Sequence, residues 1–104
     1  MRIEVLFIED CPSLERLMPH LHSCLNQAEV AGEPRMLLIR SDEQAKALRF
    51  LGSPTVRVDG LDAEPGADAR EDFGLKCRLY RTPQGLSGLP PDELILAALS
   101  RPPA

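Results

Sequence analysis

Residues 2–14 read RIEVLFIEDCPSL and contain the stretch that decides the fold. Its first seven residues are rich in β-branched and apolar side chains, and near their end both faces are apolar. This pattern is typical of a strand buried on both sides in a parallel sheet. The next four residues, EDCP, stop the strand. Pro12 suits the first position of a helix, because the N–H that proline lacks would have no intrahelical partner there. The stretch therefore predicts a buried strand that leads through Cys11 into a helix.

The helix predicted after Pro12 carries apolar side chains at the spacing of one helical face. They are Leu14, Leu17, Met18, Leu21, Cys24, Leu25 and Ala28. Pro19 lies inside this helix, where it removes one backbone hydrogen bond. Gly32 and Pro34 end the segment.

Two further strands and a second helix follow. The apolar run from Met36 to Ile39 predicts a second strand. Ser41 then caps a helix in which Gln44 completes a capping box. We expect this helix to extend to Gly52, with its core face formed by Ala45, Leu48 and Leu51. Residues 54–58 predict a third strand.

Asp59-Gly60 is a strong tight-turn signal, so residues 61–64 should return antiparallel to the third strand. Asp92 caps a last helix whose core face carries Leu94, Ile95, Ala98 and Leu99. Between the returning strand and the last helix, residues 65–91 contain many glycines and prolines. We expect an ordered loop there, with one short element around residues 76–80. A loop of that length in a small domain is usually functional.

These elements predict one α/β domain over residues 1–104, with a loop insertion at 65–91 before the last helix. The order is strand, helix, strand, helix, strand, strand, helix. A right-handed helical crossover makes the first two strands parallel. We therefore expect a four-stranded mixed sheet with flanking helices.

Composition disfavours several classes of function. The chain has 104 residues, of which 43% are hydrophobic and 27% charged, with a net charge of −4 and four aromatic residues. Acidity and the scarcity of aromatic rings disfavour nucleic-acid binding. The longest early apolar run is too short for a signal peptide or a membrane span, so we expect a cytoplasmic protein. Three cysteines are too few for a disulfide scaffold.

Cys11 is the strongest candidate for chemistry. It lies between a buried strand and a helix start, where the partial positive charge of the helix N-terminus favours a thiolate. The carboxylates of Glu9 and Asp10 oppose this effect. The alternative is a small residue at a helix start with no chemistry.

The sequence resembles the thioredoxin-like superfamily, and in particular short bacterial members whose Cys-x-x-Cys motif is degenerate. Residues 11–14, CPSL, stand where that family carries Cys-x-x-Cys, and Pro19 matches its helix proline. Residues 52–55, GSPT, resemble its Gly-x-Pro-Thr turn. The resemblance implies a thioredoxin-like fold and a cis Pro54 facing Cys11. It also implies a binding groove formed by Pro12, Ser53, Pro54 and Thr55.

In this groove we expect the N–H and carbonyl of Ser53 to be free to pair with an extended substrate backbone. The motif departs from the family at Leu14, where a second cysteine would stand. Cys11 could still form a mixed disulfide, which a second thiol must release.

Cys77 is the candidate for that second thiol. It stands in KCRLYR, residues 76–81, where three cationic side chains would favour its thiolate. We expect Arg78 to contribute to substrate binding. If the insertion folds over the start of the first helix, Cys77 can resolve the Cys11 adduct; otherwise it is an unpaired loop cysteine.

The leading hypothesis is thiol–disulfide exchange without a cofactor, catalysed by Cys11 and Cys77. Its partners would be protein or small-molecule disulfides and thiols such as glutathione. A second hypothesis is a non-catalytic module that binds a peptide or forms a homodimer. A third is capture of a soft metal or organomercurial by the two thiols. Cys24 should pack in the core, and a metal site at His20 and Cys24 lacks enough ligands.

Overall fold

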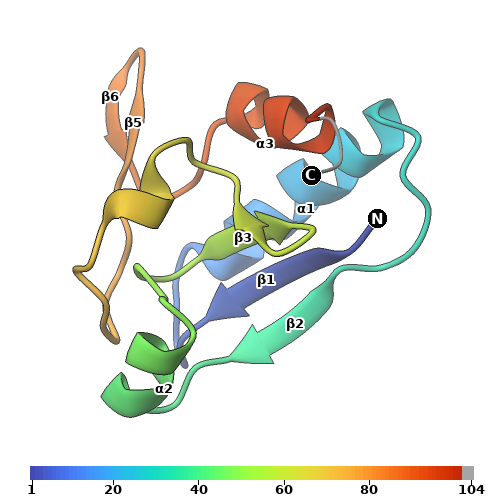
Figure 1. Cartoon of the computed structure of the whole chain (residues 1–104). Helices are drawn as coiled ribbons and strands as arrows, with labels where there is room; N and C mark the ends of the chain where they lie inside the picture. Colours follow the sequence, from blue (N-terminus) through green and yellow to red (C-terminus); the bar gives the residue numbers. More distant parts are fainter. Residues whose placement is uncertain (102–104) are drawn as a thin grey trace.

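The computed structural model describes residues 1–101, which form an α/β fold with a four-stranded mixed sheet (Figure 1). No helix in this range is both long and apolar enough to cross a membrane. The sheet is built from β1 (Ile3–Phe7), β2 (Arg35–Leu38), β3 (Thr55–Val58) and β4 (Leu61–Asp62). The helices are α1 (Leu14–Gln27), α2 (Asp42–Ala47) and α3 (Asp92–Leu99), with a 3-10 turn, η1 (Ala67–Ala69).

The strand order β2-β1-β3-β4 confirms the mixed sheet expected from the sequence. β1 pairs in parallel with β2, so that Val5 lies opposite Met36. β3 runs antiparallel to β1, with Val56 opposite Val5, and β4 returns antiparallel beside β3. β1 is therefore central and buried on both faces, as its apolar pattern indicates.

The two faces of the sheet carry separate apolar clusters. Val5 points toward α1 and α3, in a cluster that includes Leu21 and Ile95. The next residue, Leu6, points to the opposite face and packs with Phe50 and other residues around α2. Alternation along a strand thus sends α1 and α3 to one side and α2 to the other.

α1 begins two residues later than expected. Ser13 is its N-cap and Leu14 its first helical residue, so Pro12 lies in the turn before the helix. At the other end, Glu29 adopts the left-handed conformation with φ 57°. The N–H groups of Glu29 and Val30 donate back to the carbonyls of Asn26 and Leu25, which is the pairing of a Schellman motif.

α2 is shorter than predicted and ends at Ala47. Arg49 is left-handed with φ 55°, and Phe50 N–H donates to the Ala45 carbonyl over 2.7 Å, so the helix closes with the same motif. Leu48 is consequently exposed rather than in the core, and Phe50 takes its place. At the start of α2, Ser41 Oγ accepts from Gln44 N–H as predicted.

The insertion contains more regular structure than the sequence predicted. Strands β5 (Tyr80–Thr82) and β6 (Gly85–Ser87) form a separate antiparallel hairpin. Figure 1 shows it projecting from the body of the molecule. The turn has proline at its second position and Gly85, with φ 114°, at its fourth. This is a turn signal that the surrounding glycines and prolines obscure.

The left-handed Glu29 generates a stability prediction. A non-glycine residue in this conformation costs about 1–2 kcal/mol, and glycine avoids most of that cost. We expect Glu29→Gly to raise the free energy of unfolding by about 1 kcal/mol. Glu29→Ala is the matched control, because it removes the same exposed carboxylate and keeps the Cβ atom. Urea denaturation measures both, and equal stability of the two variants would contradict the prediction.

Candidate functional site

Cys11 lies in the short connection between β1 and α1. Its side chain is buried, with 8% of the residue exposed. The preceding residue, Asp10, is left-handed with φ 57°. Strained backbone of this kind is often found at functional sites. The Cys11 carbonyl accepts from Leu14 N–H over 3.3 Å, which joins the connection to the first turn of α1.

The residues around Ser53 form the second part of the site. The Ser53–Pro54 peptide bond is cis. Ser53 Oγ accepts a hydrogen bond from Ile8 N–H over 3.1 Å, three residues before Cys11. Ser53 is therefore fixed to the end of β1 that leads into the cysteine connection.

The backbone of Ser53 is not free, contrary to the expectation from the sequence. Its N–H donates to the Lys76 carbonyl over 2.8 Å, and its carbonyl accepts from Arg78 N–H over 2.9 Å. Cys77 is the residue that bridges to Ser53 in this parallel pairing. The protein's own chain thus fills the position that we had assigned to an extended substrate.

Gly52 makes this close approach feasible. Its φ of 126° lies in the region that glycine adopts without strain. A Cβ atom at Gly52 would lie 3.0 Å from Cβ of Arg78 and 3.2 Å from its Cα. Only a residue without a side chain lets the 76–78 segment lie this close.

The insertion also reaches the start of α1. A Cβ atom at Gly88 would lie 2.5 Å from Ser13 Oγ, so the chain after β6 packs directly against the N-cap of the helix. The insertion therefore contacts both parts of the motif, Ser13 after Cys11 and Ser53 before Pro54. Both cysteines are free thiols; Cys11 is buried and Cys77 is exposed.

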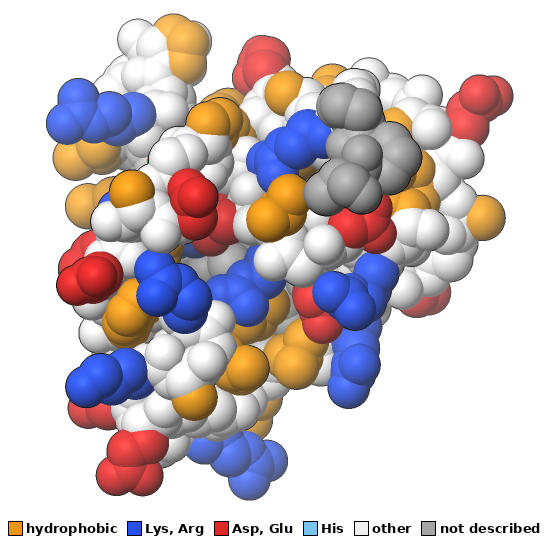
Figure 2. All heavy atoms as spheres, viewed as in Figure 1, with side chains coloured by type: hydrophobic (Ala, Val, Ile, Leu, Met, Phe, Trp, Pro, Cys, Tyr) orange, Lys and Arg blue, Asp and Glu red, His pale blue; other side chains and the backbone are white. Residues whose placement is uncertain are grey.

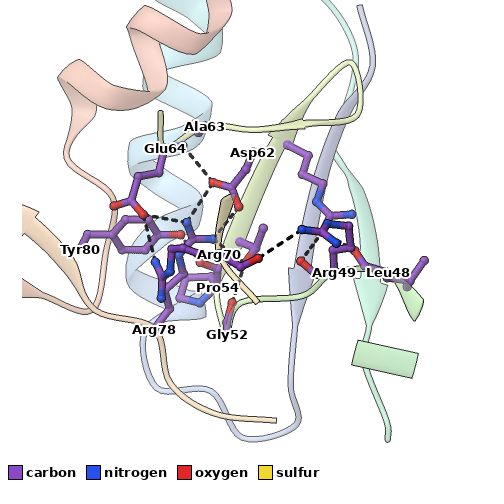
Figure 3. A network of polar contacts seen from close by, with 12 residues as sticks. Leu48, Arg49, Gly52, Pro54, Asp62, Ala63, Glu64, Arg70, Arg78 and Tyr80 are labelled. Atoms are coloured by element: carbon purple, nitrogen blue, oxygen red, sulfur yellow. Dashed lines mark hydrogen bonds and ion pairs between the residues drawn. The ribbon is translucent and has the colours of Figure 1, made fainter. Parts of the chain in front are cut away.

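Arg78 is the anchor of the 76–78 segment, and its guanidinium has no exposed surface. It donates to Asp62 through both Nη atoms, over 2.8 and 3.0 Å, and to Glu64 over 3.2 Å (Figure 3). A third acceptor is Thr55 Oγ1 at 2.9 Å, and the guanidinium stacks 4.6 Å from the Tyr80 ring centre. Arg78 is thus engaged inside the fold, contrary to the substrate contact that the sequence predicts.

The electrostatics of this cluster follow from burial. Burial lowers the pKa of Arg78, but hydrogen bonds and charge from Asp62 and Glu64 outweigh it and raise the pKa above its ordinary value. For Tyr80, whose charged form is the anion, burial has the opposite effect and raises the pKa. Tyr80 donates its hydroxyl hydrogen to the Pro54 carbonyl over 2.6 Å. The cluster therefore stays charged at Arg78 and neutral at Tyr80.

The remaining predicted groove residues differ in exposure. Thr55 is fully buried, and its hydroxyl donates to the Gly52 carbonyl over 2.6 Å. Pro54 is also buried, beneath the insertion, while Pro12 is exposed. Three of the four predicted groove residues are therefore buried and cannot contact a ligand at the surface: Ser53, Pro54 and Thr55.

Two of the three cations near Cys77 are already paired. Lys76 Nζ lies 3.0 Å from Asp72, and Arg78 is held by Asp62 and Glu64. Arg81 is exposed on the hairpin. Sequence reasoning missed Asp62 and Glu64 as partners of Arg78, although residues two apart on a strand share one face.

A small groove lies beside the Cys11 connection. It has a volume of about 320 Å³ and is lined by Ile8, Glu9, Ile39, Arg40 and Leu75. It lies where β1 and β2 end and their chains leave toward α1 and α2 on opposite faces. Ligands of α/β proteins commonly bind at such a point.

The third cysteine and the histidines have structural surroundings. Cys24 is fully buried in the α1–α3 cluster, which confirms its predicted role in packing. Burial raises the pKa of its thiol to about 11, with further contributions from Asp92 and Glu93. His20 lies 3.1 Å from Asp92, and within residues 1–101 no three potential ligands gather to hold a metal ion.

No known protein family, curated protein or solved structure matches this chain.

The Arg78 cluster generates the second prediction. Arg78→Met leaves the mostly buried Asp62 without its cation, while Glu64 keeps only its contact with Arg70. We therefore expect the free energy of unfolding to fall by about 3 kcal/mol. Arg81→Met is the control, because it removes an exposed arginine of the same segment and should change stability by about 0.5 kcal/mol at most. Urea denaturation of both variants measures the difference. Similar stabilities would show that the buried ion pair does not hold the insertion.

The third prediction concerns Cys24. Its thiol has a pKa of 9.0 when unfolded and about 11 when folded, so unfolding releases a proton between these values. Cys24 therefore makes the free energy of unfolding fall as pH rises from about 9 to 11. We expect Cys24→Ala to remove part of that fall, measured by urea denaturation at several pH values. Identical pH dependence in the wild type and the variant would contradict the assignment.

Proposed function

We propose that this protein is a thiol-based redox protein with a thioredoxin-like fold, in which Cys11 is the nucleophile and Cys77 the resolving cysteine. The observation that carries the proposal is the bridge between Ser53 and Cys77. Ser53 is also bonded to Ile8, just before Cys11. The contact of Gly88 with Ser13 supports the same arrangement from the other side.

The proposed reaction has two steps. The Cys11 thiolate attacks one sulfur of a disulfide; that S–S bond breaks, and the leaving sulfur takes up a proton as a free thiol. The Cys77 thiolate then attacks the Cys11 sulfur and releases the second substrate thiol. The substrate gains two electrons and the protein ends as a Cys11–Cys77 disulfide. An external thiol such as glutathione restores the reduced form.

The occupied Ser53 backbone indicates the class of substrate. An extended peptide cannot pair with Ser53 while residues 76–78 do so. A groove of about 320 Å³ borders the Cys11 connection at Ile8 and Glu9, and it has the size of a small-molecule site. Neither cysteine lines it, so in this proposal the groove holds the part of the substrate next to the reacting sulfur. We therefore favour a small-molecule disulfide other than glutathione disulfide over a protein strand, since glutathione itself restores the reduced protein. A reducing compartment such as the cytoplasm suits this cycle.

The fourth prediction tests this cycle by oxidation with glutathione disulfide, followed by intact mass and peptide mapping without reductant. We expect the wild type to form a Cys11–Cys77 disulfide. Cys77→Ser should instead retain one glutathione on Cys11, because the resolving thiol is gone. Cys11→Ser should lose the intramolecular disulfide. Cys24→Ala is the control, and it should behave as the wild type because Cys24 is 0% exposed and burial raises the pKa of its thiol to about 11.

A second candidate function is a non-catalytic binding module, which the burial of Cys11 and the paired backbone of Ser53 favour. In that case Cys11 stays unmodified in both the wild type and Cys77→Ser. Glutathione on Cys77 alone would have the same meaning, since an exposed thiol reacts without a site. Either result would overturn the redox proposal.

A further inference from the structure

A cavity of about 440 Å³ lies at the β4 edge of the sheet. Its wall includes three arginines from different parts of the chain: Arg49 after α2, Arg57 on β3 and Arg101 after α3. Figure 2 shows basic and acidic side chains gathered around the middle of this face. No cysteine lines the cavity, so it is separate from the thiol site.

Each of the three arginines is held by backbone carbonyls. Arg57 Nη2 donates to the carbonyls of Leu48 and Arg49, over 2.6 and 3.1 Å. Arg101 Nη2 donates to those of Asp62 and Ala63, over 2.9 and 2.8 Å.

Arg49 Nη2 is held in the same way, by the carbonyls of Asp68 and Arg70 over 3.0 and 3.2 Å. Its guanidinium also stacks 4.9 Å from the Phe73 ring centre. The three guanidinium groups are therefore fixed in position before any ligand arrives, which lowers the entropic cost of binding.

Carbonyl groups fix these arginines without neutralising them. Among residues 1–101, none of Arg49, Arg57 and Arg101 forms an ion pair with a carboxylate, whereas Arg70 and Arg78 each do so. Arg57 is half-buried, and this burial lowers its pKa from the ordinary value. Positive charge without a counterion is thus concentrated at one cavity.

The acidic residues of the wall offset this charge only in part, although the charge of Asp62 acts on Arg57 and the Asp68 carboxylate belongs to the wall. Asp62 is paired with Arg78, and Glu64 with both Arg70 and Arg78. Asp68 is exposed at the surface. Arg70 and Arg78 therefore already compensate the charges of Asp62 and Glu64.

The rest of the wall is largely apolar, including Leu48, Leu51 and Leu61. A cavity of this volume accepts a small organic molecule. Guanidinium groups bind carboxylate and phosphate oxygens with particular strength, because their planar donors match those acceptors.

We propose that this cavity binds a small organic anion that carries two acidic oxygen groups, carboxylates or phosphates, on a short carbon skeleton. The guanidinium groups of Arg49, Arg57 and Arg101 hold the acidic groups, and the leucine side chains contact the skeleton. The proposal is independent of the thiol chemistry, since it uses neither Cys11 nor Cys77.

The fifth prediction is tested by titrating the full chain, labelled with nitrogen-15, and recording amide chemical shifts at constant ionic strength. Succinate and glutarate are the probes with two carboxylates, 3-phosphoglycerate is the probe with one phosphate and one carboxylate, and sodium chloride is the control salt. We expect saturable shifts confined to residues 48–68 and 101 with at least one class of probe. The class that binds more tightly identifies the acidic group.

Arg57→Gln and Arg101→Gln should each weaken binding roughly tenfold or more, because each removes charged hydrogen bonds to the ligand. Arg81→Gln is the matched control, with the same change of charge on the exposed hairpin, and it should bind as the wild type. Arg101 follows the last helix, so its variant keeps the test valid if Arg57→Gln fails to fold. Absence of saturable binding up to about 10 mM, or equal binding by all variants, would overturn the proposal.

Discussion

The buried ion pair of Arg78 with Asp62 and Glu64 is the interaction on which the rest of the structure depends. A guanidinium without exposed surface requires both charge compensation and hydrogen bonds, because removing its charge from water costs several kcal/mol. Two carboxylates, the Thr55 hydroxyl and the Tyr80 ring supply them. This cluster fastens the insertion to the β4 edge and brings the backbone of Arg78 against Gly52. Cys77 reaches Ser53 as a consequence.

The sequence predicts the sheet well because its signals are local. A buried β1, the apolar stripe of α1 and the Asp59-Gly60 turn each occupy a few consecutive residues. Helix ends are predicted less well, since Glu29 and Arg49 close their helices in a conformation that neither residue type prefers. The β5–β6 hairpin was missed for a different reason. Its strands are three residues long and pair only with each other, so little periodicity marks them.

The candidate site could be predicted in its residues but not in its arrangement. Cys11 and Ser53 are visible as motif positions, and Cys77 stands out as a cysteine among basic residues. Whether the Ser53 backbone is free depends on a segment more than 20 residues away, and no local pattern encodes that pairing. Arg78 illustrates the same limit, because an arginine beside a cysteine suggests a surface cation. Its burial depends on two carboxylates, Asp62 on β4 and Glu64 just after it, which lie 16 and 14 residues earlier in the chain.

The Arg78 cluster also decides the electrostatics of the cavity at the β4 edge. Asp62 and Glu64 face that cavity as well as Arg78. Without the buried cation, the two uncompensated carboxylates would offset the positive charge of Arg49, Arg57 and Arg101. They would also weaken the attraction of the wall for an anion. Arg78 therefore has two effects at once: it holds Cys77 beside Ser53, and it compensates two carboxylates that also line the neighbouring cavity. A single buried charge thereby supports both proposed sites, the thiol site and the anion site.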